Sequence, residues 1–242
     1  MRHMLYLALS ALLVVGMAAL PAKAQTNGQM VVIKASGVAL QEGQVIDGSQ
    51  VLKLDAGASV TLIGSNGSTV TLTGPYQQAP VSGMAGKAED PTIVKALGKL
   101  LSSRKFSTAS LGVVRSATAQ TGIAHLDDPW IVSVESSGAR CIRPGIVVLW
   151  REDSSTDSTV TISRGSASLT AQADWAAGDN VLPLASERFR DGGTYKLDVD
   201  GNKVAFTVYV LPEEYREPGQ QAAWMIQSGC KNQALALVDA IG

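Results

Sequence analysis

The chain has 242 residues, a formal net charge of −1, and few aromatic residues among many Gly, Ser, Thr and Val residues. A near-neutral balance excludes the basic surface by which proteins attract nucleic acids or acidic membranes. The composition suits short strands and tight turns, so we expect a mainly β fold arranged as one large or two small domains.

The first 24 residues have the features of a secretory signal peptide. Arg2 gives a positive start, residues 4–20 are almost all apolar, and Ala22-Lys23-Ala24 offers an Ala-x-Ala cleavage site. We expect residues 1–24 to be removed, which places the protein in the periplasm or outside the cell with no membrane span after cleavage. A retained membrane anchor is the alternative, because the apolar run is about as long as the shortest spanning helices.

Residues 25–88 carry strand signals separated by turn signals and predict an N-terminal β domain. The clearest signal is the duplicated stretch VTLIGSNGSTVTLTGPY at 60–76. A three-residue loop at 65–67, with Gly67 in the left-handed position, places all the apolar partners on one face of a hairpin. The predicted pairs are Val60 with Leu72 and Leu62 with Val70.

Residues 89–128 predict a helix followed by a linker. Asp90 is a good cap and Pro91 suits the first helical position. Apolar residues then recur at helical spacing over 93–101, so we expect the helix to end near Ser102 or Ser103. Residues 107–128 are small and weakly patterned, with one short strand expected at 111–115.

Residues 129–212 predict a second β domain with the strand spacing of an immunoglobulin-like β-sandwich. The expected strands cover 130–135, 146–151, 159–163, 167–173, 180–184, 194–199 and 203–210. The last two should form a hairpin with a two-residue loop at Gly201-Asn202, which pairs Leu197 with Phe206.

Residues 213–242 predict a helical tail, with helices at 218–228 and 231–241 broken at Gly229-Cys230. Cys141 and Cys230 are the only cysteines. In an oxidising compartment we expect them to form a disulfide that joins the tail to the start of the sandwich. Two unlinked buried thiols are the alternative.

The residues that usually support catalysis are scarce. His125 is the only histidine left after signal removal, and it lies beside Asp127 without a nucleophile motif. The disulfide would consume both thiols, and zinc needs more Cys and His ligands than the chain has. We expect no catalytic residue, no metal and no cofactor.

The aromatic residues suggest where a partner could bind. Trp150 ends an apolar strand and Trp224 lies in an amphipathic helix, so we expect both to pack in a core. Trp175 and Tyr76 lie near loops and are better candidates for exposed contacts. We therefore predict binding residues at Pro75, Tyr76 and Trp175, together with exposed strand edges.

The stretch GVALQEGQVIDGSQVLKLDAGASVTLIGSNGSTVTLTGP resembles the FecR-like domain. The matching residues are Gly37, Gly43, Gly48, Val60, Leu62, Gly67, Ser68, Val70, Leu72, Gly74 and Pro75. The resemblance implies an extracytoplasmic β module, which in the iron-dicitrate regulator takes part in signalling with an outer-membrane receptor. The anti-sigma segment and membrane helix of that regulator have no counterpart here, so the resemblance extends to the module alone.

Together these features predict a secreted or periplasmic, non-enzymatic binding protein whose partner is an envelope or signalling protein. One alternative is a carbohydrate or peptidoglycan binding module, which would require Trp175 or Tyr76 to face solvent. A second is an uncharacterised periplasmic enzyme, which would require a deep pocket that gathers His125 with Asp127 or Glu135.

Overall fold

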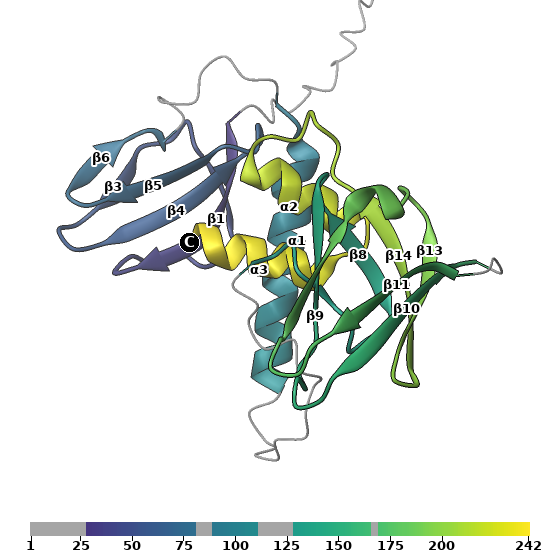
Figure 1. The fold of residues 1–242 in the computed structure, drawn as a ribbon. Coiled ribbons are helices and arrows are strands. Elements are labelled where there is room, and N and C mark those ends of the chain that lie inside the picture. The colour runs from purple at the N-terminus through teal and green to yellow at the C-terminus, as the bar shows by residue number, and fades with distance from the viewer. Residues whose placement is uncertain (1–27, 81–88, 111–127, 166–168) are drawn as a thin grey trace, which may run out of the picture.

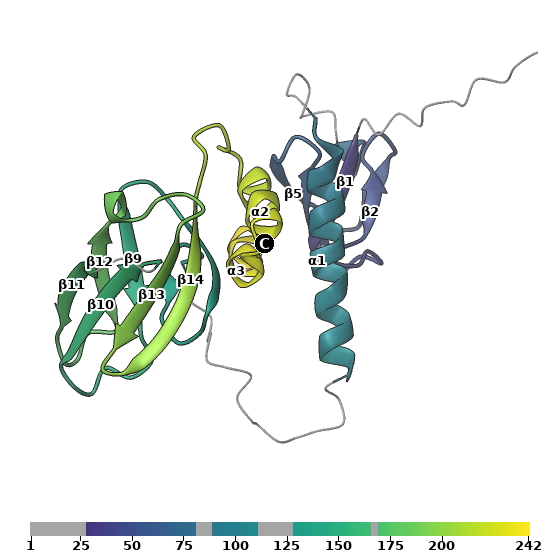
Figure 2. The same cartoon turned by 90° about the vertical axis from the view of Figure 1, so that its right-hand side faces the viewer.

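The computed structural model describes residues 28–80, 89–110, 128–165 and 169–242. It is mainly β, with one helix between two β regions and two helices at the C-terminal end. Figure 1 shows an N-terminal sheet on one side, a second β region on the other, and the three helices between them. The turned view in Figure 2 agrees, because helices α2 and α3 stand between the strands of the second region and helix α1. The signal peptide, the strand expected at 111–115, and His125 with Asp127 lie outside the described residues.

The N-terminal region contains two small sheets. Its strands are β1 (Gln29–Ser36), β2 (Val45–Asp47), β3 (Leu52–Leu54), β4 (Ser59–Gly64), β5 (Thr69–Thr73) and β6 (Tyr76–Gln78). The larger sheet has the order β2-β1-β4-β5 with antiparallel neighbours, and β3 pairs separately with β6. The first sheet ends before Gly74-Pro75, and Tyr76, which the sequence placed near a loop, begins strand β6.

The hairpin predicted at 60–76 is confirmed. Strands β4 and β5 pair Val60 with Leu72 and Leu62 with Val70. The loop between Gly64 and Ser68 has Gly67 at a φ of 81°, in the left-handed region that favours glycine. The apolar pattern therefore selects the face, and Gly67 in the left-handed position fixes the loop and with it the register.

Strands β1 and β4 are buried on both faces, whereas the sequence predicted a single apolar face. On one face Met30, Val32 and Leu62 pack with the small sheet of β3 and β6. On the other face Val31 and Ile63 pack against the three helices. Each of these strands therefore has apolar residues on both of its faces.

Helix α1 (Pro91–Ser110) begins where predicted, and the Asp90 carboxylate accepts a hydrogen bond from Thr92 N at 2.9 Å. It continues to Ser110 instead of ending near Ser102 or Ser103. The Ser103 hydroxyl donates to Leu100 O at 2.6 Å, so this residue bonds back to the helix without breaking it.

The second β region consists of two facing sheets that share one core. Its strands are β7 (Val132–Ser133), β8 (Gly138–Ile142), β9 (Ile146–Trp150), β10 (Ser158–Arg164), β11 (Leu169–Trp175), β12 (Val181–Ala185), β13 (Thr194–Val199) and β14 (Asn202–Val210), with a short 3-10 helix at Ser186–Arg188. The larger sheet has the order β11-β10-β13-β14-β8 and the smaller one β12-β9-β7. Leu149 and Leu184 of the smaller sheet pack with Ile162, Leu197 and Phe206 of the larger. The sequence did not predict β8, an edge strand in which Gly138 and Arg140 interrupt any apolar pattern.

The register predicted for the last hairpin was wrong by two residues. Leu197 pairs with Val204, and the two-residue turn is Asp200-Gly201 instead of Gly201-Asn202. Both turn residues have positive φ, 50° and 89°, as a type I′ turn requires. A shift of two keeps every side chain on its predicted face, so alternation alone could not distinguish the two registers.

The C-terminal helices α2 (Pro218–Gln227) and α3 (Lys231–Ile241) complete the core of the N-terminal region. Met225 and Val238 share one apolar cluster with Val31 and Leu97. The contact is close, because Gly219 N donates to Gly67 O at 3.1 Å in the β4–β5 loop. A Cβ atom at Gly219 would lie 2.5 Å from Ile63. The first turn of α2 is therefore packed directly against the N-terminal sheet.

The disulfide between Cys141 and Cys230 is confirmed, with Cα atoms 6.0 Å apart. It links the edge strand β8 to the residue that precedes α3, and both cysteines are buried. The second β region is thus joined covalently to the helices that cover the N-terminal sheet. Among the described residues, no helix is both long and apolar enough to span a bilayer.

Candidate functional site

The structure does not bring the three predicted binding residues together. Pro75 is exposed in the N-terminal region, and Tyr76 is half-buried opposite Leu54, against the apolar cluster of that region. Trp175 lies in the other β region, in a different core. These residues therefore do not form a single site.

The expectation that Trp175 faces solvent is wrong. Strand β11 extends to Trp175, whose side chain points into the sandwich and is 1% exposed. The Arg151 guanidinium lies 4.8 Å from the centre of its ring and donates to Ser158 Oγ at 2.6 Å and Ala176 O at 2.7 Å. Because Arg151 is itself 3% exposed, the pair is a buried structural contact.

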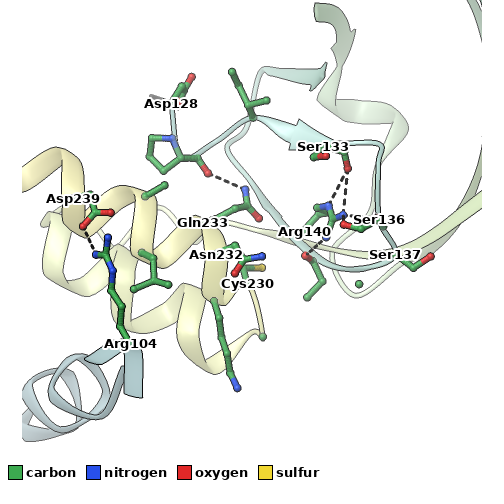
Figure 3. A pocket seen from close by; sticks show the side chains of 18 residues that line it. Arg104, Asp128, Ser133, Ser136, Ser137, Arg140, Cys230, Asn232, Gln233 and Asp239 are labelled. Atoms are coloured by element: carbon green, nitrogen blue, oxygen red, sulfur yellow. Dashed lines mark hydrogen bonds and ion pairs between the residues drawn. The ribbon is translucent and has the colours of Figure 1, made fainter. Parts of the chain in front are cut away.

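A pocket of about 660 Å³ lies where the sandwich meets helix α3 (Figure 3). One wall is formed by the segment before β7 and by β8 with its preceding turn, and the opposite wall by the first two turns of α3. Arg104 of α1 reaches the pocket and forms an ion pair with Asp239 at 2.6 Å. Hydrogen bonding to Asp239 raises the pKa of Arg104, so this guanidinium keeps its charge.

Gln233 holds the wall of the pocket together through its side-chain amide. Its oxygen accepts from Cys141 N at 2.8 Å, and its nitrogen donates to Cys141 O at 2.8 Å and to Pro129 O at 2.9 Å. The amide thereby occupies the free edge of β8 as a neighbouring strand would. It also blocks the addition of another strand at this point.

Arg140 also holds a wall of the pocket in place, on the side formed by the turn between β7 and β8. Its guanidinium donates to Ser133 O and Ser136 O, which closes the turn between β7 and β8 (Figure 3). Burial lowers the pKa of the Arg140 guanidinium. The Asp128 carboxylate on the pocket rim accepts from Trp130 N at 2.9 Å. The polar groups of the pocket are thus used mainly to hold the junction together.

Of the three residues expected in a catalytic pocket, only Glu135 lies among the described residues, and it does not line this pocket. The Glu135 carboxylate accepts from Glu152 N at 2.9 Å instead. Within the described ranges, no group of three or more His, Cys, Asp and Glu residues could hold a metal ion.

The most unusual surface is the outer face of the smaller sheet. Strand β9 turns Val147 and Leu149 into the core, so its other three residues point outward. Strand β12 turns Leu184 inward in the same way. The outward residues, here called the β9–β12 face, are Ile146, Val148, Trp150, Val181, Pro183 and Ala185. Cross-strand pairing sets them side by side as Ile146 with Ala185, Val148 with Pro183 and Trp150 with Val181.

This face is apolar where a sandwich is normally polar. Outward positions in sandwich strands are usually occupied by polar residues, and the larger sheet follows that rule with Thr161, Thr194 and Lys196. On the smaller sheet Ile146 is 68% exposed and Val181 46% exposed. Trp150 is half-buried on the outer face, so the expectation that it packs in the core is wrong.

The β9–β12 face has a signal in the sequence. Residues 146–150 read IVVLW, an unbroken apolar run in a strand with antiparallel and parallel neighbours. If one face of such a strand is in the core, the alternate apolar residues must lie on the other face. Pro183 in β12, the free edge of this sheet, lacks an N–H and so disfavours strand addition at that edge.

Comparisons with known proteins give no identity: no family model, no curated protein and no solved structure matches the chain.

Proposed function

We propose that this is an exported, non-enzymatic binding protein that docks onto another protein through the β9–β12 face. The observation that carries the proposal is the set of six adjoining uncharged residues that point outward, with Ile146 and Val181 largely exposed. Contiguous apolar surface of this kind marks interaction sites in soluble proteins. Covering large aliphatic side chains stabilises a complex by about 1.5–3 kcal/mol each when burial is complete.

Export is supported by the disulfide and by the signal-like N-terminus. Disulfides persist mainly in oxidising compartments such as the periplasm and the extracellular space. The bond between Cys141 and Cys230 joins two parts of the fold, which is a structural role. The partner would accordingly be an envelope or signalling protein.

The finer fold assignments belong to the same proposal. For the FecR-like module, the support is that Gly37, Gly43 and Gly67 of the motif all have positive φ, at 67°, 78° and 81°. These are the positions at which the motif places its turns, and glycine adopts such angles at least cost. For an immunoglobulin-like sandwich, the support is the pair of facing sheets with one shared core. The disulfide would differ from the inter-sheet bridge of antibody domains, because Cys230 lies outside the strands.

A carbohydrate-binding function is the second candidate, because Trp150 offers part of an aromatic ring on the same face. Sugars require free hydrogen-bonding groups beside the ring. Trp150 pairs with Val181 on one side and with Ser133 on the other, and Ser133 is buried with its hydroxyl accepting from Glu135 N. The other residues of the face are Val, Pro, Ala and Ile. A protein surface therefore fits the face better than a sugar does.

The proposal can be tested by photo-crosslinking in the native cell envelope. A photo-reactive residue placed at Ile146 should give a protein adduct, and the same residue at Lys196 should not, because Lys196 lies on the polar outer face of the larger sheet. Val181→Glu should remove the adduct at position 146 while leaving the free energy of unfolding within about 0.5 kcal/mol of the wild type, as for a surface change. Equal adducts at 146 and 196 would contradict the proposal.

A further inference from the structure

We infer that Asn66-Gly67, in the β4–β5 loop, is a site of spontaneous deamidation that the docked helix α2 keeps unreacted. This site lies in the N-terminal region and is independent of the β9–β12 face. An Asn-Gly pair is well suited to the reaction, because glycine has no side chain to obstruct the approach of its own backbone nitrogen. The loop can therefore modify itself, and its surroundings decide whether it does.

The reaction needs only these two residues and water. The Gly67 nitrogen, after loss of its proton, attacks the side-chain carbon Cγ of Asn66. A bond forms between these two atoms, the bond from Cγ to Nδ2 breaks, and the amide nitrogen takes up a proton and leaves as ammonia. Water then opens the resulting cyclic imide. Opening at Cγ gives aspartate, whereas opening at the main-chain carbonyl gives isoaspartate, in which the chain runs through the former side chain.

In the folded chain, hydrogen bonds within the loop hold both reacting groups. The Gly67 N–H donates to Gly64 O at 2.9 Å, so this nitrogen keeps its proton engaged. The Asn66 Oδ1 atom accepts from Ser68 N at 2.9 Å, which fixes the side-chain amide toward Ser68. Both hydrogen bonds must break before the Gly67 nitrogen can reach Cγ.

The first turn of α2 covers the loop and keeps it in this conformation. Gly219 N donates to Gly67 O at 3.1 Å, and Gln220 Nε2 donates to Asn66 O at 3.3 Å. The approach is so close that a Cβ atom at Gly67 would lie 2.5 Å from Gln220 Cγ. Asn66 is consequently only 5% exposed. A covered and hydrogen-bonded loop opens less often than a free one, so docking of α2 suppresses the reaction.

The products disfavour the return of α2 once it has been released. In isoaspartate the main chain is longer by a methylene group, so the loop no longer places Gly67 O opposite Gly219 N. The carbonyl that accepts from Gln220 becomes part of a free carboxylate. Both products also bring a negative charge to a position that is buried when α2 is docked, which is unfavourable. The reaction thus makes release of the helix irreversible.

The site can be tested by incubating the oxidised exported protein at mildly alkaline pH, where amide nitrogens lose their protons more readily. Peptide mapping by mass spectrometry follows the conversion of Asn66 to aspartate and isoaspartate. It also separates this site from Asn27-Gly28, the other Asn-Gly pair in the chain. The folded wild type should react at least about a hundredfold more slowly than the same protein unfolded in urea.

Two variants release α2 from the loop to different degrees. In Gly219→Ala the new Cβ would lie 2.5 Å from Ile63 Cγ2 and 2.6 Å from Gly67 O, so the first turn of α2 must move away. The reaction rate should then rise at least about tenfold. Gln220→Ala removes only the hydrogen bond to Asn66 O and the side chain that lies over Gly67. It should raise the rate about threefold.

The matched control is Gln227→Ala, an exposed residue at the far end of the same helix, which should react at the wild-type rate. Amide hydrogen exchange in α2 reports independently whether the helix has been released. A Gly219→Ala protein with faster exchange in α2 but an unchanged rate at Asn66 would overturn the inference. If Gly219→Ala does not fold, equal rates in Gln220→Ala and Gln227→Ala would overturn it. A folded wild type that reacts as fast as the unfolded chain would do the same.

Discussion

Strands β4 and β9 are both middle strands of their sheets, but their surroundings are opposite. Strand β4 has apolar residues on both faces, with Val60 and Leu62 on one and Ile63 on the other, and β9 is apolar at every position. Strand β4 is covered on both faces, by the small sheet of β3 and β6 on one side and by the helices on the other. Strand β9 is covered on one face only, and Ile146 is exposed to solvent on the other.

The difference in coverage shows how an unbroken apolar strand should be interpreted. Such a strand predicts two covering layers, since its side chains alternate between the faces. In the N-terminal region the chain supplies both layers itself, and the second comes from helix α1 together with two helices about 150 residues later in the sequence. In the sandwich the second layer is missing from the described part of the chain, which is why we assign it to a partner.

The largest expected effect comes from breaking the covalent link between the two regions. In the double variant Cys141→Ala/Cys230→Ala, loss of a bridge across a sequence separation of 89 residues should lower the free energy of unfolding by about 4 kcal/mol. Urea denaturation, with Asn232→Ala as the control, would measure the change. A double variant within about 1 kcal/mol of the wild type would show that the link is not structural.

The next effect tests whether the C-terminal helices belong to the N-terminal core. Met225 is fully buried in the cluster shared with β1 and α1, so Met225→Ala should cost about 2–5 kcal/mol. Amide hydrogen exchange should accelerate in β1 and β4 as well as in α2.

The matched control for Met225 is Leu197→Ala, which removes a fully buried side chain from the sandwich core. It should accelerate exchange in β10 and β13 more than in β1 and β4. If Met225→Ala changed exchange in α2 alone, the tail would not be part of the N-terminal core. The claim that the helices cover the second face of β4 would then be wrong.

A smaller effect is expected at the junction of the two regions. Gln233→Ala leaves the backbone groups of Cys141 and the carbonyl of Pro129 without the side-chain partner that they have now. We expect a loss of about 1–3 kcal/mol and faster exchange of the Cys141 amide. Asn232→Ala, an exposed neighbour on the same helix, should be nearly neutral. An unchanged Cys141 amide in Gln233→Ala would contradict the role given to this side chain.

Much of the local structure could be predicted from the sequence because alternation and turn chemistry are short-range. In the hairpin at 60–76 the apolar pattern and the left-handed glycine at Gly67 agree on one register, so its pairs were predicted correctly. The last hairpin has two registers that differ by two residues and preserve the faces. There the positive φ of Asp200 and Gly201 selects the register, because the turn needs two residues in the left-handed region.

What could not be predicted depends on contacts distant in sequence. The tail helices were predicted with nearly correct bounds, but no local pattern shows that Gly219 packs against the β4–β5 loop. Trp175 was misplaced because a residue near a loop can still point inward when its strand extends to it. The disulfide was the one long-range contact that the sequence predicted, since export and a pair of cysteines suffice to predict it.

The most direct test of the central claim is whether the open face of β9 is covered in the native envelope. The measurement is the ratio of photo-crosslinked adduct at Ile146 to adduct at Lys196, two outward positions on opposite sheets of one sandwich. The account predicts a ratio far above one, which Val181→Glu returns to about one. A ratio near one in the unaltered protein would contradict it.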